Sequence, residues 1–125
     1  MKIAALIARL LLGLAFFVFG LNAFFQFISA PLPSGLAGQF VTVLFQSHYL
    51  LAVGACQVVG GALLLANRYV PLGLTVLGPV VVNILLYHFL LDTHGLPAAM
   101  IVAILWLVLF LRYKQNFSGL FVAKA

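Results

Sequence analysis

Charged side chains are scarce in this chain. Only 6% of its 125 residues are Asp, Glu, Lys or Arg, whereas 66% are hydrophobic. An ordinary globular domain has about 25% charged residues, so too few are present here to cover a water-soluble surface. Lipid must therefore replace water around most of the chain, and the sequence predicts a single-domain integral membrane protein.

Acids and cysteines are scarcer still, because Asp92 is the only acid and Cys56 the only cysteine. A lone cysteine forms neither an internal disulfide nor a CxxC pair, which excludes the four-helix thiol–quinone enzymes that use paired cysteines. No nucleophile–base pair points to a stand-alone enzyme. A small dimeric transporter for a small molecule or ion stays an alternative. A proton-coupled transporter normally needs a carboxylate inside the membrane, however, and only His88 could replace it.

Four long apolar runs cover residues 3–28, 48–66, 70–91 and 96–112. About 20 apolar helical residues span the ~30 Å hydrocarbon core of a bilayer. Backbone groups in lipid must be satisfied within the segment, and the runs lack the alternation of barrel strands, so helices are expected. The sequence therefore predicts an all-α bundle of four transmembrane helices. A cleaved signal peptide is the alternative for the first run, but Arg9 interrupts the apolar core that such a peptide needs.

The six basic residues all fall on one side of the predicted membrane: Lys2, Arg9, Arg68, Arg112, Lys114 and Lys124. The positive-inside rule places both termini, including a basic tail at 113–125, on the cytoplasmic side of a bacterial-type inner membrane. Anionic headgroups are the natural counterpart of the net charge of +5, so membrane lipid is an expected partner and nucleic acid is not. Arg9, about two turns into the first helix, is expected to reach these headgroups with its long side chain.

The segment between the first two runs has a pattern of its own. Two prolines, at positions 31 and 33, cannot continue the first helix. Leu36, Phe40 and Leu44 then recur on one helical face, with Gln39 and Gln46 elsewhere on the wheel. The spacing predicts a short amphipathic helix that lies in the outer interface or plugs the bundle. A partly buried loop is the alternative.

Small residues mark the second run. Ala52, Cys56 and Gly60 recur at every fourth position, and Gly61 follows directly. Small side chains let helix backbones approach closely, which drives association where lipid surrounds the helices. These four residues are predicted to form helix–helix contacts.

Three stretches carry a family resemblance: RLLLGLAF at 9–16 leading to FGLN at 19–22, QVVGGALLL at 57–65, and RYVPLG at 68–73. They resemble the DoxX-like family of small four-helix membrane proteins. The resemblance implies quinone-linked redox chemistry, since relatives serve as subunits of a thiosulfate:quinone oxidoreductase or accompany superoxide dismutase and sulfurtransferase partners.

The resemblance thus implies an accessory or quinone-contacting subunit of a membrane redox complex, with no catalytic site of its own. A homo-oligomer or a larger redox complex is the implied assembly, and quinone is the implied cofactor. Relatives often carry Glu where this chain has Gln57. An amide does not titrate, so the departure argues against a proton-linked role at that position.

Polar residues within the runs are candidate ligand-binding residues because such groups are costly in lipid. They are Asn22, Gln26, Gln57, Asn83, Tyr87 and His88. Antiparallel threading brings all six to the middle-to-outer part of the bundle. One interpretation is amide hydrogen bonding between helices, at about 0.6–1.7 kcal/mol per bond. The other is a polar-lined pocket for a quinone or another small amphiphile, although Asn83 and His88 lie about 140° apart on their helix.

Histidines gather at the outer face and raise the question of a metal or haem. His88, Asp92 and His94 could offer three ligands to a metal ion, but no second acid or nearby cysteine supports such a site. A bis-histidine haem would need His48 and His88 at similar depth, which their positions in the runs do not favour. No metal is therefore expected, and His88 is expected to pair with Asp92 one turn further on.

Overall fold

The computed structural model describes residues 2–27 and 31–123, and these residues form helices, turns and short irregular stretches, with no strand among them. Ile28, which the sequence assigns to the first helix, and Lys124 lie outside them. The elements are α1 (Lys2–Phe25), α2 (Gly35–Gln46), α3 (Tyr49–Ala66), α4 (Val70–Leu90), η1 (Thr93–Gly95), α5 (Leu96–Arg112) and η2 (Lys114–Phe121). In the described chain four stretches are long and apolar enough to span a membrane: α1, α3, α4 and Thr93–Arg112. The predicted all-α, four-span fold is confirmed.

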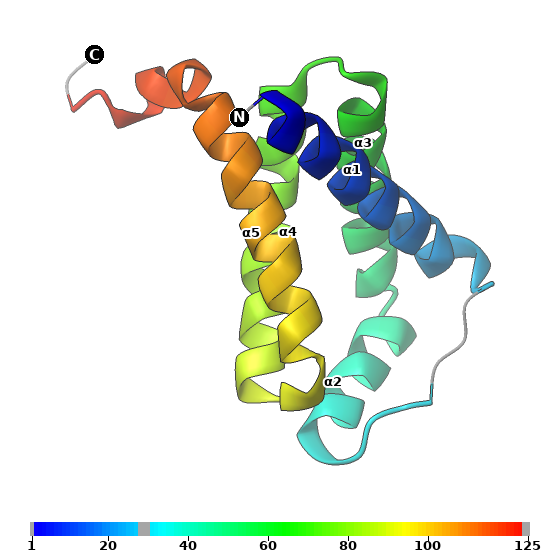
Figure 1. Cartoon of the computed structure of the whole chain (residues 1–125). Coiled ribbons are helices and arrows are strands. Elements are labelled where there is room, and N and C mark those ends of the chain that lie inside the picture. The colour runs from blue at the N-terminus through cyan, green and yellow to red at the C-terminus, as the bar shows by residue number, and fades with distance from the viewer. Residues whose placement is uncertain (1, 28–30, 124–125) are drawn as a thin grey trace.

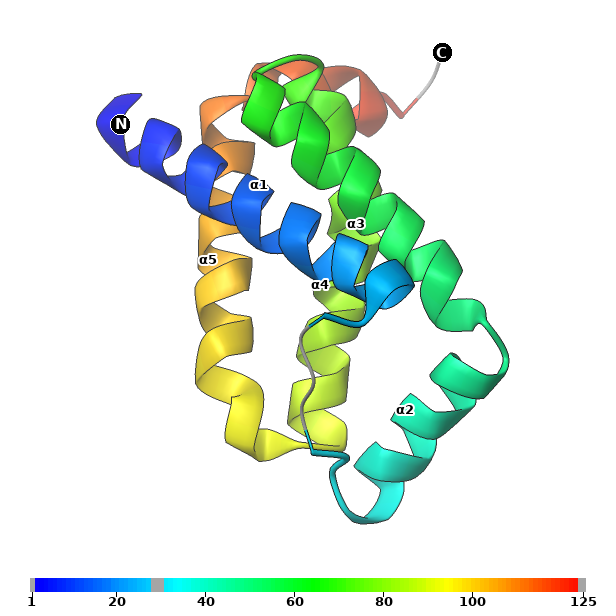
Figure 2. The same cartoon turned by 90° about the vertical axis from the view of Figure 1, so that its right-hand side faces the viewer.

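The four spans pack as a bundle in which α1 has its most extensive contact with α3, and α4 lies against both α3 and α5. Helix α1 runs obliquely across the other spans (Figures 1 and 2). The start of α1, the α3–α4 turn and η2 lie at one end of the bundle, while α2 and η1 lie at the other (Figure 1). The amphipathic helix expected between the first two spans is present as α2, so the alternative of a loop is wrong.

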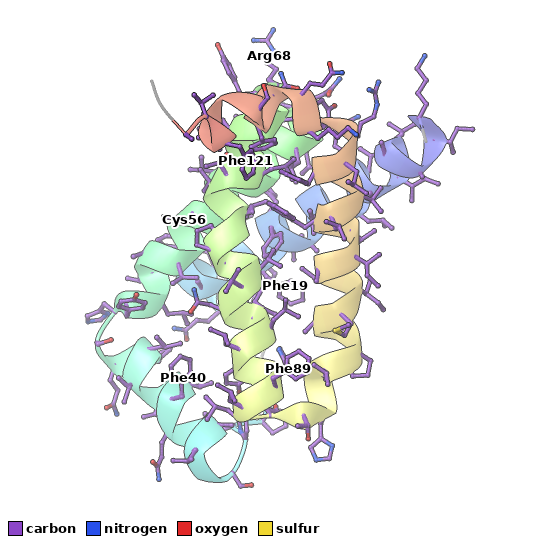
Figure 3. All side chains as sticks on the ribbon, turned by 90° about the vertical axis from the view of Figure 1, so that its left-hand side faces the viewer. Phe19, Phe40, Cys56, Arg68, Phe89 and Phe121 are labelled. Atoms are coloured by element: carbon purple, nitrogen blue, oxygen red, sulfur yellow. The ribbon has the colours of Figure 1, made fainter. Side chains whose placement is uncertain are left out.

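Helices α3 and α4 are joined by a tight turn. Asn67 ends α3 in the left-handed conformation, with φ of 54°, and the N–H of Arg68 donates to the carbonyl of Leu63 at 3.1 Å. This pairing satisfies one of the carbonyls left open at a helix C-terminus. Pro71 lies in the first turn of α4, where its missing N–H costs nothing. The turn places Arg68 at the extreme of this end (Figure 3).

The core of the bundle combines leucine, valine, alanine and phenylalanine side chains. Trp106 of α5 donates its indole N–H to the carbonyl of Leu74 in α4 at 3.0 Å, so a polar side chain joins these two helices. Otherwise α5 buries little, and much of its apolar surface faces outward. The completely buried large side chains are Leu12, Leu64, Leu74, Leu77 and Leu109.

Glycines make the contact between α1 and α3. A Cβ added to Gly61 would lie 2.6 Å from the backbone nitrogen of Phe17, and one added to Gly20 would lie 2.7 Å from that of Val58. Distances this short leave no room for a side chain, so the two backbones touch. Gly60 faces the other way, toward Leu77 of α4, where an added Cβ would lie 2.5 Å from Cγ. Gly60 and Gly61 thus pack against different helices.

The prediction that Ala52 and Cys56 also form helix–helix contacts is wrong, because both are exposed and line a cavity. The reason is rotation about the helix axis. At 100° per residue, Gly54 lies 200° away from Ala52, and it is the face of Gly54 and Gly61 that meets α1. The four-residue spacing identified a stripe of small residues, but the contact with α1 uses the stripe on the other side of α3.

Candidate functional site

A cavity of about 580 Å³ opens between α2, α3 and α4. Phe40 of α2 and Cys56 of α3 both lie on the same side of α4 (Figure 3). Most of the wall is apolar. The lining residues are Phe40, Val41, Leu44, Tyr49, Leu50, Ala52, Val53, Cys56, Gln57, Val76, Pro79, Val80, Asn83, Ile84, Tyr87 and His88.

Four of the six predicted site residues line this cavity: Gln57, Asn83, Tyr87 and His88. Asn83 and His88 both take part although they lie about 140° apart, because the wall covers a broad arc of α4 from Val76 to His88. One cavity therefore collects the polar side chains of two spans.

Asn22 and Gln26 do not line the cavity, so their predicted place in it is wrong. Gln26 follows the end of α1 with a positive φ of 51°, is exposed, and donates its backbone N–H to the carbonyl of Asn22 at 2.8 Å. These two residues lie away from the cavity because α1 packs on another face of α3. Helix α1 meets α3 through Gly54 and Gly61, whereas the cavity lies against the face that carries Ala52 and Cys56.

The two cavity amides do not bond between helices. Asn83 donates from Nδ2 to the carbonyl of Pro79, one turn earlier on its own helix, at 2.8 Å. This bond uses one amide hydrogen and leaves Oδ1 and the second N–H for other partners. The Gln57 amide has no hydrogen-bonding partner among the described residues. Neither side chain therefore acts as the interhelical link that the first interpretation of the polar residues required.

His88 lies at the edge of the cavity between an aromatic ring and a turn. Its Nδ1 is 2.8 Å from the carbonyl of Ile84, and since a carbonyl only accepts, Nδ1 carries the proton. The rings of Tyr87 and His88 meet edge to face, with centroids 5.0 Å apart. An added Cβ on Gly95 would lie 2.4 Å from His88 Nε2, so the ring packs closely on η1.

The expected pair of His88 with Asp92 is wrong. The Asp92 carboxylate instead accepts from the backbone N–H of His94 at 3.2 Å and caps η1. The pairing fails because α4 ends at Leu90 and Asp92 adopts an extended conformation, so helical i, i+4 spacing no longer applies. Among the described residues no three His, Cys, Asp or Glu side chains gather to hold a metal ion, and His88, Asp92 and His94 form no such site. His48 is exposed at the α2–α3 turn and does not line the cavity.

Helix α2 forms the outer wall of the cavity with its apolar face. Phe40 and Leu44 line the cavity, and the Phe40 ring centroid lies 5.8 Å from that of Tyr87. The amphipathic pattern of α2 is visible in the sequence, but the pattern does not assign these residues to the site. The spacing of Val76, Val80, Asn83 and Tyr87 on one face of α4 is the signal that could have found the rest of the wall.

Comparison with known proteins gives two matches. The model of the DoxX family matches residues 4–90. The uncharacterized protein YwoB of Bacillus subtilis (strain 168) is 31% identical over 121 residues, which cover 90% of this chain and 79% of that protein. No solved structure matches the chain significantly. The chain belongs to the DoxX family.

Proposed function

We propose that this DoxX-family membrane protein contacts a quinone in the cavity between α2, α3 and α4 and serves as an accessory subunit of a membrane redox complex, without a catalytic site of its own. The observation that carries the proposal is the Gln57 amide. It opens into an apolar cavity within the spans and has no hydrogen-bonding partner among the described residues. Gln57 is partly buried, and an amide that faces an apolar cavity among lipid-facing helices without a partner is costly, so a ligand in the cavity would supply one.

The cavity suits a quinone ring in size and in chemistry. Its volume of about 580 Å³ falls within the range of ligand pockets, and such pockets combine apolar walls with a few polar groups. A quinone ring is apolar apart from two carbonyl acceptors. Gln57, Tyr87 and the second N–H of Asn83 supply donors on two walls of the cavity.

An accessory role fits the side chains of this cavity better than catalysis does. Amides bind a ligand but do not exchange protons near neutral pH, and Cys56 has no second cysteine in the chain with which to cycle. The transporter alternative has no comparable support, because Asp92, the only acid, is engaged at the cap of η1. His88, the one possible substitute, has its Nδ1 on the Ile84 carbonyl and its ring packed on Gly95. Partner subunits of a larger redox complex would supply the electron-transfer chemistry, and a homo-oligomer is the alternative assembly.

The distribution of charge supports an orientation in a bacterial-type inner membrane. Lys2, Arg68, Arg112 and Lys114 are exposed at the end of the bundle where α1 starts and η2 lies, and Asp92 lies at the other end. The positive-inside rule then places the basic end in the cytoplasm and the cavity toward the outer leaflet.

Quinone retention tests the proposal. The protein, extracted gently from its native membrane, is purified, and bound lipids are identified by mass spectrometry alongside Gln57→Leu, Asn83→Leu and the control Thr75→Val. Thr75 is a polar residue of α4 that bonds within its own helix to Pro71 and does not line the cavity. We expect both cavity variants to lose quinone while the fold survives, and Thr75→Val to retain it. A wild-type protein that carries no quinone or other amphiphile contradicts the proposal.

A further inference from the structure

The segment after α5, the helix η2, packs against the bundle. Phe117 of η2 is only 6% exposed, and its ring centroid lies 5.0 Å from that of Phe110. Phe110 in turn stacks on Trp106, with centroids 5.4 Å apart and planes 8° apart. The sequence predicts only a basic tail here, and the structure adds a helix that these aromatic contacts fasten to α5.

Apolar side chains at the end of this helix have no cover. Leu120, Phe121 and Val122 are 73%, 76% and 61% exposed. The last span ends at Arg112, two residues before η2 begins, so η2 lies where hydrocarbon gives way to headgroups. Phe121 lies closer to the middle of the bundle than Arg68, which stands at its extreme (Figure 3). The exposed apolar residues are therefore at the depth of the membrane interface.

The same end of the bundle is strongly basic. Arg68, Arg112 and Lys114 are exposed, and Asp92, the only acid of the chain, lies at the opposite end. The Arg112 guanidinium lies 5.9 Å from the centroid of the Tyr113 ring, a distance at which the ring attracts the cation. No acid of the chain can neutralise these cations.

We propose that η2 and the residues up to Val122 form an interfacial anchor that binds anionic phospholipid at the basic end of the bundle. Exposed apolar side chains beside Lys and Arg are the pattern of segments that lie in the headgroup region of anionic membranes. Three apolar side chains are too few for a stable protein interface, which needs roughly 800 Å² from each partner. The proposal goes beyond the proposed function, because the anchor lies at the end of the bundle opposite α2 and the cavity.

Site-specific quenching in vesicles tests the anchor. The full chain carries Cys56→Ser and Phe121→Cys, and the new cysteine is labelled with an environment-sensitive dye. The labelled protein is reconstituted into phosphatidylcholine vesicles with or without about 30% phosphatidylglycerol. Asn116→Cys is the matched control, because in a 3₁₀ helix position 116 lies on a different face from position 121. Leu120→Cys repeats the measurement if Phe121→Cys does not assemble.

We expect the label at position 121 to be quenched by lipids that carry a quencher near the headgroup and to be shielded from aqueous iodide. The label at position 116 should be open to iodide. Phosphatidylglycerol should increase the shielding at 121, and Arg112→Gln with Lys114→Gln should abolish that increase. Equal access of iodide to both labels overturns the proposal, as does a label at 121 that neither iodide nor lipid quencher reaches, since protein then covers it. An absence of any effect of phosphatidylglycerol overturns the anionic preference.

Discussion

The guanidinium of Arg9 in α1 donates a 2.5 Å hydrogen bond to the main-chain carbonyl of Leu64 at the C-terminal end of α3. A second bond, of 3.3 Å, goes to the carbonyl of Leu65. The carbonyls at the C-terminus of a helix carry partial negative charge, so a cation is well placed there, where the Leu64 carbonyl also accepts from the N–H of Asn67 at 3.2 Å. Arg9 thus joins two spans, and the prediction that its side chain reaches the headgroups is wrong. This contact leads to the first prediction.

Replacing Arg9 by Gln should lower the stability of the bundle. The variant loses a charge-assisted bond to the end of α3, at a cost of about 1–2 kcal/mol. Thermal unfolding in detergent measures the effect, with Lys2→Gln as the control, because Lys2 is an exposed cation in the same helix. Equal melting temperatures for Arg9→Gln and wild type would show that the contact contributes nothing.

Replacing Gly61 by Ala should force α1 and α3 apart. The new Cβ would lie 2.6 Å from the Phe17 nitrogen and 2.8 Å from the Gly13 carbonyl oxygen, and backbone atoms cannot give way as side chains do. Overpacking of this kind costs about 1–3 kcal/mol.

Gly119→Ala is the matched control, because an added Cβ there meets nothing within 4 Å. Leu107→Ala, at an exposed position of α5, should also have a smaller effect than Gly61→Ala. A reversed order of melting temperatures in detergent would show that the α1–α3 contact is looser than the glycine distances imply.

Cys56 offers a direct probe of the cavity because it is the only cysteine and lies exposed in the cavity wall. A small maleimide should alkylate it in detergent, and a short-chain quinone analogue should slow the reaction by occupying the same space. The control carries Cys56→Ser with Gly119→Cys, whose thiol lies in η2, away from the cavity. Its alkylation should not respond to the analogue, and an unchanged rate at Cys56 would count against quinone binding.

The orientation of the bundle can be tested with reporter fusions. A reporter fused after Ala125 should report the cytoplasm, and one inserted into α2 should report the opposite compartment, because α2 and η2 lie at opposite ends of the bundle. Reporters that agree with each other would contradict the four-span topology, because three spans separate α2 from the C-terminus. A reporter after Ala125 that reports the outer compartment, with the α2 reporter in the cytoplasm, would reverse the proposed orientation and leave the fold unchanged.

Part of the candidate site was predictable because polar residues stand out in an apolar run. Gln57, Asn83, Tyr87 and His88 were identified on that basis, and they line one cavity. The same reasoning wrongly included the amides of the first span. Residue type shows that a side chain is costly in lipid, but it does not show which neighbouring helix that side chain faces.

The sequence by itself determined the number of spans, their approximate limits, the amphipathic helix between the first two, and the one-sided distribution of charge. These properties follow from local composition, since transfer into lipid is decided residue by residue over about 20 positions. Only the tertiary structure decided that α1 meets α3 through Gly54 and Gly61, and that Ala52 and Cys56 consequently open onto a cavity. Lipid is as apolar as the helices, so hydrophobicity does not select which faces meet, and close backbone approach at particular glycines does.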